Sequence, residues 1–144
     1  MERDKKERQG VDYRSILTAY HQARDAYRQE PSLDNERRLA GAEGLLVSAA
    51  LFLPGKFSLG QTVATPGAIA AMVEADQIPV EFLLRHKFGD WGDDLPPEDV
   101  QENERALQEG SRLFSAYHTR LGEKLWVITE WDRSATTILK PDEY

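Results

Sequence analysis

Apolar residues in the first third of the chain recur with the period of an α-helix. Between Val11 and Gln29 they are spaced by three, four and seven residues, which places them on one helical face: Tyr13, Ile16, Leu17, Tyr20 and Tyr27. Pro31 ends this helix, and Ser32 is a favourable N-cap for a second helix that runs to about Leu53. The pattern therefore predicts a helical hairpin at the N-terminus.

Three shorter helices are predicted in the middle of the chain. Thr65 as N-cap and Pro66 at the first helical position begin "TPGAIAAMVEAD". "IPVEFLLRHK" is a second helix, with Leu83 and Leu84 facing inward. "LPPEDVQENERALQEG" is a third, with acids in its first turns and an end at Gly110. The segment "KFSLGQTVAT" before them is a possible short strand.

The last 33 residues are rich in β-branched and aromatic side chains. The runs "RLFSAYHT", "KLWVITEWD" and "SATTILKP" are separated by "RLGE" and "DR", which predicts a three-stranded antiparallel meander. The fold class is therefore α+β, with an added hairpin at 1–55 and an α+β core at 56–144 in one compact domain. Both faces of the predicted sheet are partly apolar. One face can pack on the central helices, and the other needs the hairpin or a second subunit, which favours a homodimer.

Composition adds bounds on location and chemistry. The chain has 144 residues, 40% of them apolar, and no cysteine, which excludes disulfides and thiolate chemistry. The start "MERDKKERQG" does not read as a signal peptide, and the longest apolar run, 45–53, is far shorter than the roughly 20 residues that a membrane helix needs. These features predict a soluble protein of the cytoplasm.

Negative charge is concentrated in one segment. The net charge is −7, and residues 90–109 hold eight acids and one base, so this window alone carries −7. Such a surface repels nucleic acid, so direct nucleic-acid binding is not expected, and it attracts basic surfaces. A solvated helix face is the simpler interpretation. The partner-binding interpretation uses Trp91 as apolar anchor and the following acids: Asp90, Asp93, Asp94, Glu98, Asp99, Glu102 and Glu104.

The segment "RHKFGDWGDD" raises a catalytic alternative. A metal-independent ribonuclease needs a general acid or base and cations near the phosphate. His86 is the candidate acid or base, Arg133 the candidate cation, and Tyr117 or Thr137 the candidate phosphate-orienting group. In the structural alternative, His86 donates a hydrogen bond that locks the 89–94 turn. No metal-ligand spacing, EF-hand loop, phosphate loop or dinucleotide motif occurs, so we expect no metal and no cofactor.

Two resemblances to known families bear on function. The stretches "TPGAIAAMVEA", "LLRHKFGDWGD", "ENERALQEGSRLFSAY" and "LWVITEWDRSATTILKPDEY" resemble a family of uncharacterised proteins of bacterial plasmids, integrative elements and prophages, the "plasmid-related proteins". This resemblance covers residues 57–144 and implies residence on a mobile element. "LLRHK" and "ATTILKP" also resemble pieces of the barnase-like and RelE-like ribonuclease toxins, most of which are basic, unlike this chain.

These observations predict a non-catalytic accessory protein of a mobile element. Its acidic surface would bind and inhibit a host complex that targets nucleic acid, of the CRISPR or restriction type. The alternative is a ribonuclease toxin that uses His86 and Arg133.

Overall fold

The computed structural model describes residues 12–144. The predicted first helical residue, Val11, and the charged segment 1–10 lie outside the described residues. The chain divides into two compact units, 1–53 and 54–144, which we describe separately. Over the described part of the chain, none of the helices combines the length and the apolar character needed to span a membrane.

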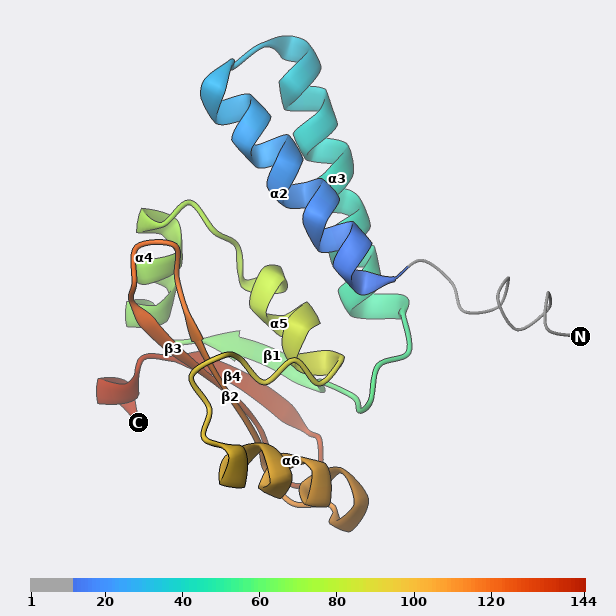
Figure 1. Ribbon diagram of the computed structural model, residues 1–144, viewed down its shortest axis with the longest axis vertical. Coiled ribbons are helices and arrows are strands. Elements are labelled where there is room, and N and C mark those ends of the chain that lie inside the picture. Colours follow the sequence, from blue (N-terminus) through green and yellow to red (C-terminus); the bar gives the residue numbers. More distant parts are fainter. Residues whose placement is uncertain (1–11) are drawn as a thin grey trace, which may run out of the picture. The chain divides into compact units, whose positions relative to one another are not determined.

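The first unit is the predicted helical hairpin. Helices α2 (Tyr13–Gln29) and α3 (Leu33–Phe52) run side by side in opposite directions (Figure 1). The predicted cap is confirmed, because the Ser32 hydroxyl accepts a hydrogen bond from the Asn35 backbone N–H at 3.1 Å. The Asn35 side-chain amide also donates to the carbonyl oxygens of Glu30 and Ala26. Asn35 therefore ties the turn to the end of α2.

The second unit contains a sheet and the three predicted central helices, and the predicted ends of these helices are confirmed. The Thr65 hydroxyl caps the first of them, and Gly110, with φ of +77°, ends the last. The elements in chain order are β1 (Gln61–Ala64), α4 (Pro66–Glu74), α5 (Pro79–Lys87), α6 (Pro97–Glu109), β2 (Leu113–His118), β3 (Lys124–Thr129), β4 (Ala135–Leu139) and the 3₁₀ turn η1 (Pro141–Glu143).

The sheet has four strands of mixed orientation in the order β1-β4-β3-β2, so the prediction of a three-stranded antiparallel sheet is wrong. Strands β2, β3 and β4 are antiparallel neighbours, as the short turns between them require. The possible strand after Phe57 joins the sheet as β1, parallel to β4, with Gln61 opposite Ala135. A parallel pair needs a long crossover and leaves no local turn signal, which is why the chain pattern did not place β1.

Helices α4 and α5 pack on one face of the sheet. Side chains from both helices and from β2, β3 and β4 form one buried cluster there: Leu59, Ala68, Ala71, Met72, Phe82, Leu83, Tyr117, Leu125, Val127 and Ile138. The inward orientation predicted for Leu83 and Leu84 is confirmed, since both are buried. This cluster is the main core of the second unit.

The opposite face of the sheet is partly covered by the chain's own C-terminal residues. The ring of Trp126 lies edge-to-face on Phe114 and on Tyr144, with centroids 5.1 and 5.9 Å apart. Ile128 and Leu139 on this face are buried. A shallow cleft of about 200 Å³ remains, lined by Phe114, Trp126, Ile128, Tyr144 and Arg112. The second apolar face therefore gives little reason to expect a second subunit on the sheet.

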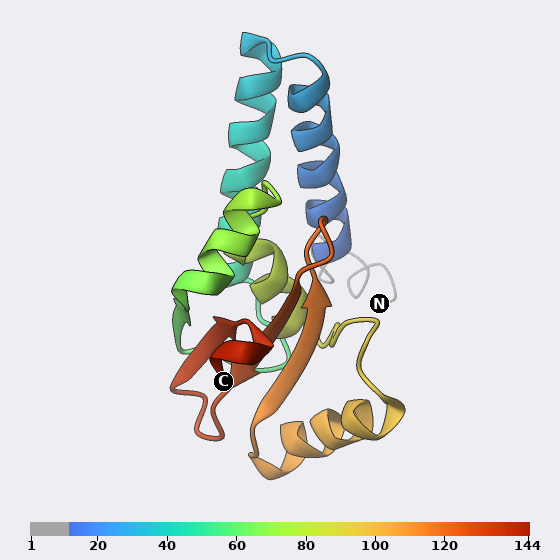
Figure 2. The same cartoon turned by 90° about the vertical axis from the view of Figure 1, so that its left-hand side faces the viewer.

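Polar groups outside the sheet close the free edge of β2. The Asn103 side chain on α6 mimics a strand: its amide donates to the Phe114 carbonyl at 2.6 Å, and its carbonyl accepts from the Phe114 N–H at 3.0 Å. Two residues further on, the Ala116 N–H donates to the Trp91 carbonyl at 3.0 Å. Figure 2 shows α6 leading directly into β2. Asn103 therefore fixes the helix to the strand that follows it.

We expect Asn103→Ala to lower the free energy of unfolding by about 2 kcal/mol or more. The substitution removes two hydrogen bonds and leaves the backbone N–H and carbonyl of Phe114 without their partners. Urea unfolding monitored by tryptophan fluorescence measures this. Asn103→Asp keeps the acceptor but loses the donor and should be intermediate. Gln108→Ala on the exposed side of α6 is the control and should change little. An Asn103→Ala protein as stable as wild type would contradict this role.

Candidate functional site

The segment 85–94 is a structural junction between α5, β2 and α6. The Arg85 guanidinium binds the Asp90 carboxylate through two hydrogen bonds, of 2.7 and 3.3 Å. The guanidinium carbon also lies 4.4 Å from the centre of the Tyr117 ring, a cation–π contact. The Tyr117 hydroxyl donates in turn to the Asp90 carbonyl. Asp90, predicted as a partner-binding acid, therefore stabilises this turn through its carboxylate and its carbonyl.

Trp91 is buried rather than exposed. Its side chain is 4% exposed, and its ring lies against Phe57 and His86 at centroid distances of 6.2 and 5.6 Å. The indole N–H donates to Glu104 on α6 at 3.2 Å. The next residue, Gly92, has φ of +94°, and a Cβ there would collide with the Ala116 carbonyl. Trp91 thus joins α6 to the sheet and cannot serve as the surface anchor that the sequence suggested.

His86 lies between the helix α5 and the core face of the sheet, with no exposed surface. Its Nδ1 lies 2.5 Å from the Ser115 hydroxyl on β2, and its Nε2 lies 2.9 Å from the Thr129 hydroxyl on β3. The Thr129 hydroxyl lies 2.7 Å from that of Thr136 on β4, which donates to the Leu59 carbonyl at 2.6 Å. The histidine therefore ties α5 to three strands, and both hydrogen bonds of its ring go to the sheet and not to the 89–94 turn.

The directions of these consecutive hydrogen bonds determine the tautomer of His86. A hydroxyl has one proton to donate. Because Thr136 gives its proton to Leu59, Thr129 must donate to Thr136 and accept from Nε2–H of His86. Nδ1 is then the acceptor for the Ser115 hydroxyl. Every proton is used once, and the imidazole is neutral.

Burial also keeps His86 neutral. Loss of solvent, with a smaller repulsion from the Arg133 charge, lowers the pKa of His86 from 6.5 to about 3. The Ser115 hydroxyl beside Nδ1 has the geometry of a nucleophile beside a base. Ser115, however, is as buried as His86, so neither atom can reach a substrate in this conformation.

The four residues of the ribonuclease alternative do not form one site. His86 lies on the core face of the sheet, and so does Thr136. Thr137 follows Thr136 in β4 and therefore points to the opposite face of the sheet. The Tyr117 hydroxyl is bound to the Asp90 carbonyl. The strands therefore separate Thr137 from His86, which no spacing in the sequence could reveal.

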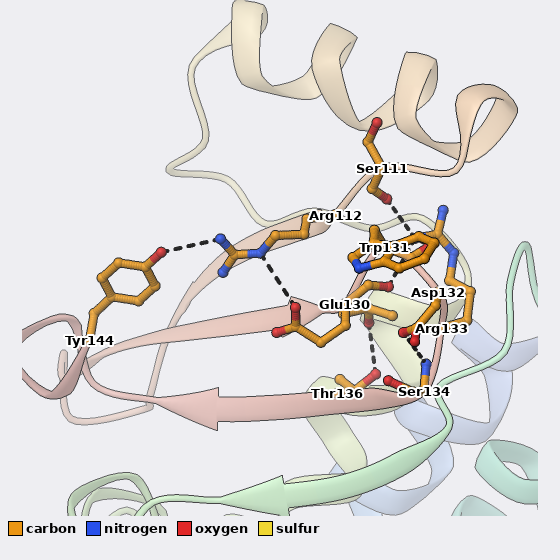
Figure 3. A network of polar contacts seen from close by, with 10 residues as sticks. Ser111, Arg112, Glu130, Trp131, Asp132, Arg133, Ser134, Thr136 and Tyr144 are labelled. Atoms are coloured by element: carbon orange, nitrogen blue, oxygen red, sulfur yellow. Dashed lines mark hydrogen bonds and ion pairs between the residues drawn. The ribbon is translucent and has the colours of Figure 1, made fainter.

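Arg133 holds the β3–β4 turn and the end of α6 together. This residue has φ of +61°, an unusual value for a residue with a side chain. Its guanidinium donates to the carbonyl oxygens of Ser111, Ala106 and Trp131, at 2.5, 3.1 and 3.3 Å. Figure 3 shows the side chain reaching toward Ser111 below α6. Arg133 thus satisfies backbone carbonyls at the end of a helix and in a tight turn, in place of a phosphate.

Several acids of the 90–109 window are paired. The Lys124 ammonium, 3.0 Å away, holds the pKa of Asp94 below its usual range. Glu102 pairs with Arg105 at 2.8 Å, and Glu104 lies 3.9 Å from the Lys56 ammonium. Asp93 is exposed on the turn before α6.

Three acids of α6 remain without an ion pair among residues 12–144: Glu98, Asp99 and Glu109. All three are exposed. Glu98, Glu102 and Glu109 are separated by four and seven residues, so they form one outward stripe along the helix. Glu98 and Asp99 also stabilise the N-terminus of α6 by their charge.

Trp131 is the exposed tryptophan that the sequence did not single out. Continued alternation along β3 would put Trp131 on the same face as Val127, but the strand ends at Thr129 and Trp131 is 66% exposed in the following turn. The Arg133 guanidinium donates both to the carbonyl oxygen of Trp131 and to that of Ala106 in the last turn of α6. The backbone of Trp131 therefore lies close to the C-terminal end of α6, the end that carries Glu109, the last acid of the stripe.

The described residues contain no group of three or more side chains suited to hold a metal ion. No family model, curated protein or solved structure matches the chain. The fold and this site define an α+β protein with a fully buried histidine, His86, and an acidic helix, α6. The resemblance to plasmid-related proteins stays a prediction.

We expect the wild-type protein to lose stability as pH falls from 6.5 toward 3. In that window the unfolded chain binds a proton at His86 and the folded chain does not, so each pH unit lowers the free energy of unfolding by about 1.4 kcal/mol. Above pH 6.5 this contribution is constant. Urea unfolding at several pH values measures the slope.

His86→Gln is the matched variant, because a glutamine amide can accept from Ser115 and donate to Thr129 without titrating. It should be less pH-dependent than wild type. Equal slopes for wild type and His86→Gln would contradict a neutral, buried His86.

Proposed function

We propose that this protein is a non-catalytic binding protein that docks its acidic α6 surface on a basic protein surface. The observation that carries the proposal is the exposed stripe of Glu98, Glu102 and Glu109, together with the exposed indole of Trp131 in the turn whose backbone lies near the end of α6. Complementary charge speeds encounter and sets orientation, and a tryptophan supplies apolar contact at a binding hot spot. In this proposal Trp131 takes the anchor role that Trp91, buried against Phe57, cannot take.

The partner class follows from the charge and from the resemblance. Carboxylates spaced by about 6 Å (Glu98 to Glu102) and about 10 Å (Glu102 to Glu109) along a helix compete for the same arginines and lysines that bind nucleic-acid phosphates. We therefore propose a host complex that targets nucleic acid, of the CRISPR or restriction type, as the partner. The resemblance to plasmid-related proteins implies residence on a mobile element. An element of this kind would benefit from an inhibitor of the host complexes that target its nucleic acid.

The geometry gives the ribonuclease alternative less support. Its candidate base, His86, is neutral, fully buried and hydrogen-bonded at both nitrogens. Its candidate cation, Arg133, is bound to four carbonyl oxygens across a turn and a helix end. A nuclease would need both groups in contact with one phosphate.

We expect reversal of the acidic stripe to abolish inhibition. The variant Glu98→Lys, Glu102→Lys, Glu109→Lys and the variant Trp131→Ala are each expressed in bacteria with an active restriction or CRISPR system. These cells are then transformed with a targeted plasmid. Wild type should raise transformation at least tenfold, and both variants should lose most of that gain, because attraction to a basic surface becomes repulsion or the apolar anchor is removed.

The matched control reverses three exposed acids elsewhere: Glu30→Lys, Glu74→Lys and Asp142→Lys. It changes the net charge by the same amount and should keep the activity. Equal loss in the control would show a general charge effect, and full activity of the stripe variant would sink the proposed surface. A wild type without effect on any such system would remove the proposed partner class.

A further inference from the structure

Strand β1 forms an open border of the sheet. It is the outermost strand in the order β1-β4-β3-β2 and pairs with β4 on one side only, as Figure 3 shows. The border at β2 is closed by the side chain of Asn103 and the carbonyl of Trp91. Among residues 12–144 no strand or polar side chain closes β1 in this way, and three of its four residues are exposed. A border of this kind offers unpaired N–H and carbonyl groups to an incoming strand.

The backbone groups that β1 turns outward are those of Thr62 and Ala64. The N–H of Gln61 donates to the carbonyl oxygen of Ser134, directly before β4, at 2.9 Å, so Gln61 faces the β4 side. Alternate residues of a strand direct their N–H and carbonyl groups to opposite sides. Thr62 and Ala64 therefore present two donors and two acceptors away from the sheet. Within the described part of the chain, none of these four groups has a hydrogen-bond partner.

A pocket of about 170 Å³ adjoins this border, between β1 and α5. It is lined by uncharged residues of β1, β4 and α5, all of them in the second unit: Thr62, Val63, Ala64, Ile138, Pro79 and Leu83. Thr62 and Ala64 lie opposite Thr136 and Ile138, whose side chains are buried on the face that α5 covers. Since a cavity of about 150 Å³ holds a benzene molecule, the pocket has room for one leucine, isoleucine or phenylalanine side chain.

An extended peptide matches both features at once. Its backbone supplies donors and acceptors at the spacing of Thr62 and Ala64, which a helix or a small apolar molecule does not do. In neighbouring strands, residues directly opposite each other point to the same face of the sheet. A peptide residue opposite Thr62 or Ala64 therefore points toward α5 and enters the pocket, while its neighbours point to the other face.

We propose that β1 and the adjoining pocket bind an extended segment of another protein by strand addition. The segment forms a fifth strand beside β1 and places one apolar side chain in the pocket. Because β1 has only four residues, few backbone hydrogen bonds form, and the pocket supplies the selectivity. The site lies at the border of the sheet opposite to β2 and α6, so it does not depend on the acidic surface proposed above.

Selection from a display library of random linear peptides, with the full chain as bait, tests this proposal. Wild type should enrich peptides with apolar residues at alternate positions. Each selected peptide should protect the amides of Thr62 and Ala64 from hydrogen exchange, measured by NMR. N-methylation of the peptide residues that face β1 should lower affinity about tenfold or more, because it removes the docking donors. N-methylation of the residues between them should not.

Variants of β1 separate the backbone from the pocket. Thr62→Pro removes one outward N–H and leaves the bond of Gln61 intact, so it should weaken binding about tenfold. Thr62→Val keeps that N–H and should bind like wild type. Ala64→Leu fills the pocket and should also weaken binding, whereas Gln61→Leu adds the same side chain outside the pocket and should not. Urea unfolding identifies a variant that has lost its fold, and the methylated peptides on wild type then decide.

Three outcomes would overturn the proposal. The first is that wild type enriches no peptide. The second is that the selected peptides bind Thr62→Pro and Ala64→Leu as tightly as wild type, or leave the two amides unprotected. The third is a wild-type dimer in sedimentation equilibrium that Thr62→Pro converts to a monomer of 16.3 kDa, because a second copy of the chain would then occupy β1.

Discussion

The neutral imidazole of His86 is the contact on which the second unit depends. It is the one side chain that bonds to β2 and β3 directly and to β4 through a threonine, while its own helix packs over them. A polar group this deeply buried is tolerated only when every lone pair and proton has a partner. The register of the sheet meets that condition, because it places Thr129 opposite Thr136 and Ser115 within reach of Nδ1. Together with the apolar packing of Phe82 and Leu83, this set of bonds fixes α5 over the sheet.

The same arrangement explains why the segment that looks most catalytic in the sequence is structural. A histidine, an arginine, a tryptophan and several aspartates within ten residues are typical of an active site. Here Arg85 and Asp90 neutralise each other, Trp91 fills the space beside His86, and Gly92 allows the chain to pass close to β2. The surface that we propose for function is instead the outward side of α6 and the adjacent turn, where Glu98, Glu109 and the indole of Trp131 are exposed.

Local signals in the sequence predicted local structure well. The caps Ser32 and Thr65 and the terminator Gly110 stand where the helices begin and end, because capping depends only on residues a few positions apart. The parallel pairing of β1 with β4 was missed, because its partners are more than 70 residues apart. The assignment of Trp91 as a surface anchor was wrong, and the exposure of Trp131 was missed. Each depends on where a strand stops and on which element lies beside it, and neither is encoded in the alternation of apolar residues.

The amide of Asn103 and the carbonyl of Trp91 have a consequence for the behaviour of the protein in a crowded cell. They occupy the hydrogen-bonding groups of Phe114 and Ala116 that an incoming strand would use. The opposite border of the sheet is β1, which is only four residues long. Exposed strands of full length are the templates on which misassembly and fibril growth begin. With one border capped and the other short, the sheet offers little template for the growth of aggregates, even at high expression.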